Sequence, residues 1–207
     1  MIVAEVSGQQ AKVDVTNLAT GGFSRTLVDC DNGVIRSFPS VVGGLLLNNV
    51  TLGTLNVQYV SGVLAPSQAA FESVNWGLQW TGIYNLSGSA NVPFQGNNFS
   101  LVLNKSPLTL TCQTTAFGAA AFDAITVIAG TYPKALKVIC VAESLVTGTV
   151  NGQPVSGTIT GRSTQWFALN VGLLKMQVDS ASFSLLGISL PLNLDSQVEL
   201  LHFQPAP

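Results

Sequence analysis

Residues 74–84 read Val-Asn-Trp-Gly-Leu-Gln-Trp-Thr-Gly-Ile-Tyr, and this stretch decides the fold class of the chain. Large apolar side chains fall mostly at even positions and polar ones mostly at odd positions. Trp76, Trp80 and Tyr84 therefore lie on one face of an extended strand. Alternation with a period of two residues is typical of a half-buried antiparallel strand.

The same alternation recurs along the chain, most clearly at 108–113 and 136–143, whereas helical periodicity is hard to find. The strands predicted on this basis are 2–7, 10–17, 25–30, 34–38, 45–51, 54–60, 74–84, 87–94, 99–104, 108–115, 123–128, 134–142, 145–150, 154–160, 164–168, 172–178, 181–189 and 197–203. Only the segment that begins at Pro66 and Ser67 reads as a short helix. We therefore expect an all-β fold built on a large curved antiparallel sheet (half-barrel, barrel or sandwich), with at most one short helix near 66–73.

Turn signals separate the predicted strands. Asn151-Gly152 lies between two alternating segments and predicts a two-residue hairpin, because both residues tolerate positive φ. Gly96-Asn97-Asn98 separates another pair. The chain shows no linker and no repeat, so we expect residues 1–207 to form a single β domain.

Charged residues are scarce: the 207 residues include 8 Lys and Arg and 10 Asp and Glu, or 9%. Soluble proteins usually carry about 25%. Such a surface of neutral polar groups suits a protein that is secreted, at the cell surface or in the periplasm, so we expect an extracytoplasmic location. The net charge of −2 and the lack of a basic cluster argue against nucleic-acid binding. The longest apolar stretch, 116–129, is too short for a transmembrane span.

The three cysteines, Cys30, Cys112 and Cys140, form no CxxC pair, so we expect no metal site. Cys112 and Cys140 both fall on the alternating positions that carry the apolar side chains of their predicted strands. We expect them to form a disulfide, which leaves Cys30 as a free thiol. In a simple meander, the 123–128 strand would separate the two cysteines by about 10 Å, too far for a bond. The disulfide therefore requires the 123–128 segment to pair elsewhere.

Catalytic motifs are absent from the sequence. His202 is the only histidine, and we interpret it as an outward polar residue of a terminal strand. Residues 29–33, Asp-Cys-Asp-Asn-Gly, lack the spacing of a calcium loop and predict a turn that Asp31 initiates. We expect neither a catalytic activity nor a cofactor.

The second half of the chain carries an ordered set of short motifs. Ala129-Gly130-Thr131-Tyr132 is followed by Ala135-Leu136-Lys137-Val138. The segment 166–175, Trp-Phe-Ala-Leu-Asn-Val-Gly-Leu-Leu-Lys, and then Val198-Glu199-Leu200 come after them. Over about residues 112–203 this order resembles a loose group of secreted bacterial β-sheet proteins and lipoproteins, most of them without an assigned function. The resemblance implies an extracytoplasmic, curved antiparallel sheet, and it supplies no catalytic residues.

Two functions fit these observations. A curved sheet with few charges suits a non-catalytic module that binds a lipid or another apolar ligand on its concave face, with Trp76, Trp80 and Tyr84 as candidate ligand-binding residues. Burial in the core is the other interpretation of the same aromatic stripe. The alternative function is a structural subunit of a surface layer or filament, in which self-association or an envelope partner uses strand addition. The first 17 residues could then be a strand lent to a neighbour.

Overall fold

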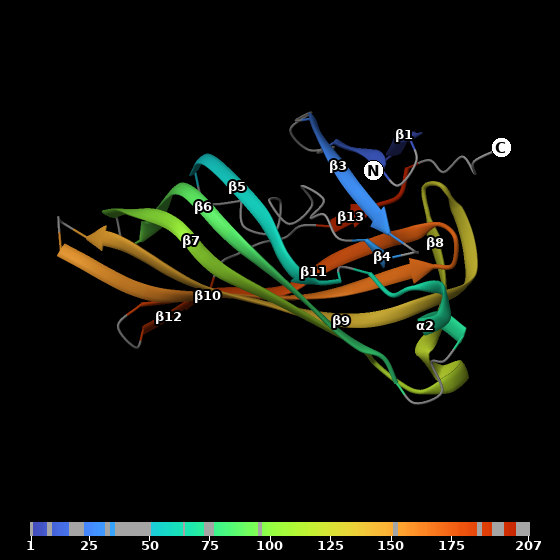
Figure 1. Ribbon diagram of the computed structural model, residues 1–207. Coiled ribbons are helices and arrows are strands. Elements are labelled where there is room, and N and C mark those ends of the chain that lie inside the picture. Colours follow the sequence, from blue (N-terminus) through green and yellow to red (C-terminus); the bar gives the residue numbers. More distant parts are fainter. Residues whose placement is uncertain are drawn as a thin grey trace.

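The computed structural model describes residues 2–7, 10–16, 23–31, 34–35, 51–63, 65–72, 77–94, 97–150, 153–185, 188–191 and 197–201. These residues form antiparallel strands in two sheets, a helix α2 (Gln68–Glu72) and a 3-10 turn η2 (Gly118–Ala121) (Figure 1). The all-β prediction is confirmed, and α2 lies within the predicted helical segment near 66–73.

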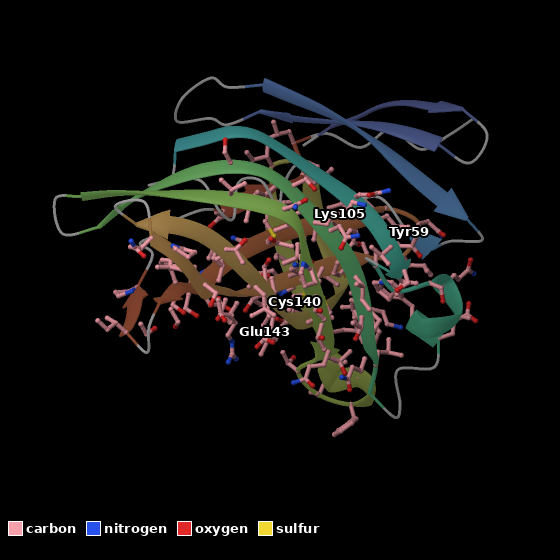
Figure 2. All side chains as sticks on the ribbon, turned by 60° about the vertical axis from the view of Figure 1, so that its left-hand side comes forward. Tyr59, Lys105, Cys140 and Glu143 are labelled. Carbon is pink, nitrogen blue, oxygen red and sulfur yellow. A yellow bond between two sulfur atoms is a disulfide. The ribbon has the colours of Figure 1, made fainter. Side chains whose placement is uncertain are left out.

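A small sheet holds the first four strands in the order β1-β2-β3-β4. Its strands are β1 (Ile2–Ser7), β2 (Gln10–Thr16), β3 (Phe23–Asp31) and β4 (Val34–Ile35). Asp31 pairs with Val34, so the chain reverses direction there, where the sequence predicts a turn. The small sheet lies above the large one in both views (Figures 1 and 2). That residues 1–207 form one domain stays a prediction.

The large sheet has the order β12-β11-β10-β9-β7-β6-β5, with β13 paired to β11 and β8 paired to β9. Its strands are β5 (Thr51–Gly62), β6 (Gln79–Phe94), β7 (Asn97–Thr114), β8 (Phe122–Val127), β9 (Gly130–Val150), β10 (Gln153–Ala168), β11 (Gly172–Leu185), β12 (Ile188–Pro191) and β13 (Gln197–Glu199). Within the described residues the path from β12 to β5 does not close, so this is an open, twisted and curved sheet (Figure 1).

The strands are longer than the sequence predicts. The predicted strands 99–104 and 108–115 are one strand, β7, because the chain between them forms a bulge rather than a turn. Lys105 takes a φ of 50° in this bulge, and its N–H donates to Ser87 Oγ. Residues 105–107, which separate two predicted strands, therefore interrupt the pairing without ending the strand. Val150 pairs with Gln153, so the strands on either side of Asn151-Gly152 form the predicted hairpin, while the two turn residues themselves lie outside the described residues.

The pairing of strand β9 shows why the 123–128 segment does not lie between Cys112 and Cys140. The later part of β9 pairs with β7, where Thr114 lies opposite Val138, and its first part pairs with β8, where Phe122 lies opposite Leu136. Strand β10 occupies the other edge of β9. Strands β7 and β8 therefore follow one another along a single edge of β9, and the 123–128 segment does not separate the two cysteines.

The larger hydrophobic core lies on one face of the large sheet, which we call the core face. Its residues alternate with those of the opposite face, which we call the charged face because it carries side chains such as Glu143 and Arg162. The buried members of the core are Ala65, Trp80, Tyr84, Leu86, Leu103, Leu108, Leu110, Cys112, Ala121, Leu136, Val138, Cys140, Val146, Phe167 and Phe183. Helix α2 contributes Phe71, which packs against this cluster.

A second, smaller core forms where β8 joins β9. Ala135 and Ala168 belong to it, whereas their sequence neighbours Leu136 and Phe167 belong to the larger core. The strands are therefore buried on both faces at this end. The backbone N–H of Leu200 donates to the Leu174 carbonyl, and the N–H of Ala129 donates to the Leu200 carbonyl. These two hydrogen bonds hold Leu200 against the second core.

Candidate functional site on the core face

The predicted aromatic residues occupy the interior of the larger core. Trp80 is 9% exposed and Tyr84 is 0% exposed. The ring of Trp80 meets that of Phe167 edge to face at 6.2 Å, and Tyr84 meets Tyr59 in the same way at 6.0 Å. Trp76 lies outside the described residues. Core packing thus accounts for Trp80 and Tyr84, and their contact with a ligand stays a prediction.

The phenol of Tyr84 has an unusual environment for an ionisable group. Burial raises the pKa of Tyr84 well above its ordinary value of 10.0, and the neighbouring Tyr59 adds to the rise. A buried oxyanion would lose its hydration, so the neutral phenol is the form that the fold stabilises.

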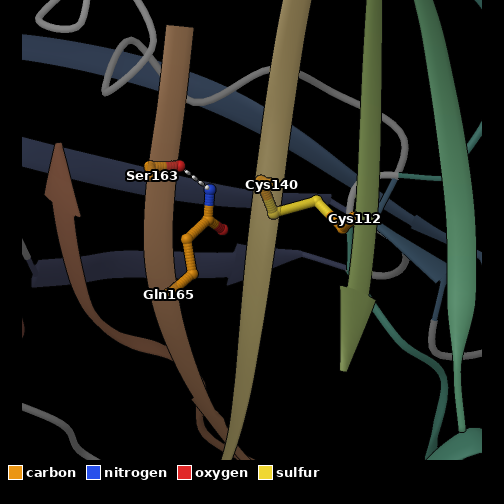
Figure 3. The surroundings of a disulfide bond; sticks show 4 residues. All are labelled: Cys112, Cys140, Ser163 and Gln165. Carbon is orange, nitrogen blue, oxygen red and sulfur yellow. Dashed lines mark hydrogen bonds between the residues drawn. A yellow bond between two sulfur atoms is a disulfide. The ribbon is translucent and has the colours of Figure 1, made fainter. Parts of the chain in front are cut away.

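The predicted disulfide between Cys112 and Cys140 is confirmed. The two residues lie directly opposite one another on β7 and β9, with Cα atoms 4.0 Å apart, and both side chains are buried. Figure 3 shows the bond beside Ser163 and Gln165 of the next strand. Cys30 lies in β3, opposite Ile35 of β4.

Polar side chains are also buried on the core face. Gln165 Nε2 donates to Ser163 Oγ at 3.1 Å, and Cys140 lies opposite Ser163 (Figure 3). Ser144 is 3% exposed, and within the described part of the chain its Oγ has no hydrogen-bond partner. A buried hydroxyl without a partner costs free energy, so Ser144 requires an explanation.

A row of small residues crosses the sheet between these polar groups. Ala142 of β9 lies opposite Gly161 of β10, which lies opposite Ala181 of β11. All three are partly exposed, although the flanking residues of their own strands on this face include the buried Ser144, Ser163 and Phe183. Within the described part of the chain, a Cβ atom added at Gly161 would meet no atom within 4 Å. The core face therefore has an open space above Gly161.

Two other described glycines on this face, Gly157 and Gly82, are closely packed, in contrast to Gly161. A Cβ added at Gly157 would lie 2.4 Å from the Ser184 carbonyl oxygen, and one at Gly82 would lie 2.9 Å from that of Val63. Those two glycines allow close approach of neighbouring groups. Gly161 has no such role.

Charged groups near this row lie on the charged face. Arg162 Nε lies 3.9 Å from Asp179 Oδ2, which also accepts a hydrogen bond from Thr164 Oγ1 at 2.8 Å. Glu143 follows Ala142 directly and so points to the opposite face from it. In Figure 2, Glu143 and Cys140 of β9 are labelled among the described side chains. Among the described side chains, the neighbours of the open space on the core face are consequently apolar or neutral polar groups.

A second set of charged groups lies at the other end of the strands. Asp123 Oδ2 accepts a hydrogen bond from Trp166 Nε1 and forms an ion pair with Lys137, whose Nζ lies 5.7 Å from the Trp166 ring centre. Lys175 pairs with Glu199 at 3.1 Å. These carboxylates are engaged by neighbouring cations. Among the described residues, no group of three His, Cys, Asp or Glu side chains could hold a metal ion.

Sequence analysis missed Ala142, Gly161, Ala181 and Ser144. The available signal was the run of small residues Gly157, Gly161 and Ser163 on the apolar parity of one strand. The interpretation of 161–163 as a gap between two strands concealed it, because β10 runs through this segment without interruption. His202 lies outside the described residues.

Among the described helices, none has the length and apolar character needed to cross a membrane. The chain matches no protein-family model, no curated protein and no solved structure.

Proposed function

We propose that this protein is a non-catalytic extracytoplasmic β-sheet module, secreted or held in the cell envelope, which binds a lipid or another apolar ligand on the core face of its curved sheet. The observation that carries the proposal is the open space above Gly161 among the described residues. It lies in a partly exposed row of small residues, and most of the residues in the flanking rows are buried. Pockets for apolar ligands are typically lined by hydrophobic side chains with a few placed polar groups.

The surroundings of the core support an apolar ligand. Several hydrophobic side chains pack against the buried cluster but stay partly exposed, among them Tyr59, Val63, Phe71, Leu78, Ile159 and Leu173. Leaving apolar surface in water costs about 25 cal/mol per Å². A ligand that covers these groups would recover part of that free energy.

The extracytoplasmic location is supported by the disulfide and by the composition. Disulfides form and persist in oxidising compartments and are rare in the cytosol. The sparse charge, 9% of residues, agrees with a location outside the cytoplasm.

The test of ligand binding is mass spectrometry of protein exported to an oxidising compartment and purified without detergent. We expect the native mass to exceed that of the chain, and organic extraction to release a hydrophobic compound. A bare chain that also takes up nothing from a mixture of neutral lipids contradicts the proposal.

The second candidate function, assembly by strand addition, has one observation in its favour. Strand β5 is an edge of the large sheet, and within the described residues it pairs with β6 alone. Its sequence, TLGTLNVQYVSG, holds neither a charge nor a proline, the features that usually protect an edge strand. Strand β1 pairs with β2 of the same chain, so β5 is the better candidate for contact with a neighbour.

Light scattering after size-exclusion chromatography tests this candidate. Val60 lies in β5 and is 48% exposed, so Val60→Lys adds a charge to the edge. Assembly through β5 predicts oligomers that grow with protein concentration and that Val60→Lys disperses. A monomer at every concentration rules this candidate out and leaves the ligand proposal standing.

A further inference from the structure

The row Ala142–Gly161–Ala181 has the dimensions of a narrow binding site. It spans three adjacent strands, and two strand spacings amount to about 10 Å. The φ of Gly161 lies outside the left-handed region, so the backbone does not require glycine there. Nothing in the packing of the described residues explains the missing side chain, whereas a bound group would.

The walls of this site are largely apolar. On one side lie Ile159 and Phe183, which pair across β10 and β11; on the other lie the Cys140 half of the disulfide and Val178. These groups suit a hydrocarbon chain laid across the strands.

Ser144 supplies the observation that points to a polar group on the ligand. It lies two residues from Ala142 on the same face, and its cross-strand partner Ile159 lies two residues from Gly161. Side chains two apart on a strand leave the same face. Ser144 therefore lies on the core face in the row next to that of Gly161, and its hydroxyl is buried and without a partner among the described residues.

Around this row the described side chains of the core face carry no charge, which selects between ligand classes. A carboxylate or phosphate moved out of water needs a cation or several donors in compensation. Among the residues whose side chains the structure describes, the charged neighbours of this row on β9, β10 and β11 are Glu143, Arg162 and Asp179. They lie on the opposite face, where Arg162 and Asp179 engage one another. A hydroxyl, ester or amide needs only one hydrogen bond, which Ser144 can supply.

We infer that Ala142, Gly161 and Ala181 form the floor of a site for one neutral amphiphile, an alkyl chain with a hydroxyl, ester or amide group, and that Ser144 Oγ hydrogen-bonds to that group. This inference rests on the proposed function and specifies where the ligand binds and which class it belongs to.

Calorimetric titration with 1-decanol and with sodium decanoate at about pH 8, where the carboxylate is ionised, tests the inference. We expect the wild-type protein to bind decanol at least about tenfold more tightly than decanoate, because the carboxylate would be buried without a counter-charge. Equal or tighter binding of decanoate overturns the assignment of a neutral ligand.

Variants that fill the site test its position. Gly161→Leu places a side chain in the open space, and Ala181→Leu fills it from the next strand; each should weaken decanol binding at least about tenfold. Thr160→Leu adds the same apolar group on the charged face and should stay within about twofold of wild type. If both filling variants fold and bind decanol as the wild type does, the site is not here.

Ser144→Ala removes a single oxygen and keeps the test valid even if both leucine variants fail to fold. We expect decanol binding to weaken about fivefold, the effect of one hydrogen bond. Unchanged affinity in Ser144→Ala overturns the role of Ser144. These results differ from failure of the proposed function, in which the wild type binds neither probe and carries no extractable compound.

Discussion

Cys112 and Cys140 join two strands that already pair, at directly opposed positions. The bond closes a loop with a sequence separation of 28 residues, and it restricts the unfolded chain more than the folded one. We expect the double variant Cys112→Ala/Cys140→Ala to lose about 3–4 kcal/mol of unfolding free energy in the chain-entropy model. Urea unfolding measures the loss, with Cys30→Ala as the control that keeps the bond. An unchanged midpoint in the double variant would contradict this account.

Tyr84 predicts how stability responds to alkaline pH. Its pKa is raised in the folded protein, mainly by burial and further by Tyr59, whereas in the unfolded chain it is about 10. Below pH about 10 the phenol is neutral in both states and the shift has no effect. Above it, the unfolded chain releases a proton that the folded protein retains, so stability falls as pH rises.

We therefore expect Tyr84→Phe to lose less stability than the wild type between about pH 9 and 11. Urea midpoints across this range measure the difference, and each protein's midpoint at about pH 7 serves as its own reference. Parallel curves for the two proteins would show that Tyr84 ionises equally in both states.

At the scale of strands, Gly157 and Gly161 provide a matched pair within β10. Gly157→Ala would place a Cβ 2.4 Å from the Ser184 carbonyl oxygen, so β10 and β11 would have to separate. We expect it to cost roughly 1–3 kcal/mol. Gly161→Ala meets open space and should be neutral or slightly stabilising. Thermal unfolding of both variants checks this, and an equal loss for the two would contradict the open space.

Leu200, directly after β13, belongs to the second core. Leu200 is buried there, and its backbone bonds to both Leu174 and Ala129. Leu200→Ala should cost about 2–4 kcal/mol through the cavity that it leaves. It should also speed hydrogen exchange at the Ala129 amide, whereas the partly exposed Leu201 gives a milder control variant. Exchange at Ala129 that is equally slow in both variants would argue against this role of Leu200.

At the scale of the whole molecule, the side-chain parity of individual strands was predictable from sequence. Trp80 and Tyr84 lie on the buried parity, and Cys112 and Cys140 meet because both follow the same alternation. These properties depend on residues two positions apart. The alternation therefore suffices to place a side chain on a face.

The length of the strands and the open space were not predictable, because both depend on residues far apart in sequence. The polar residues near Lys105 favour a turn locally, yet pairing with β6 continues on both sides of the bulge. Ala142, Gly161 and Ala181 become a row only through the register of three strands. Sequence gives a residue's face, whereas strand register determines its neighbours across the sheet.

The most direct test of the central claim, that a neutral amphiphile binds on the core face, is the set of intermolecular nuclear Overhauser effects between bound 1-decanol and protein methyl groups. We predict contacts from the alkyl chain to the methyls of Ala142 and Ala181. Contacts confined to methyls of the charged face, such as those of the exposed Leu145, would contradict the account.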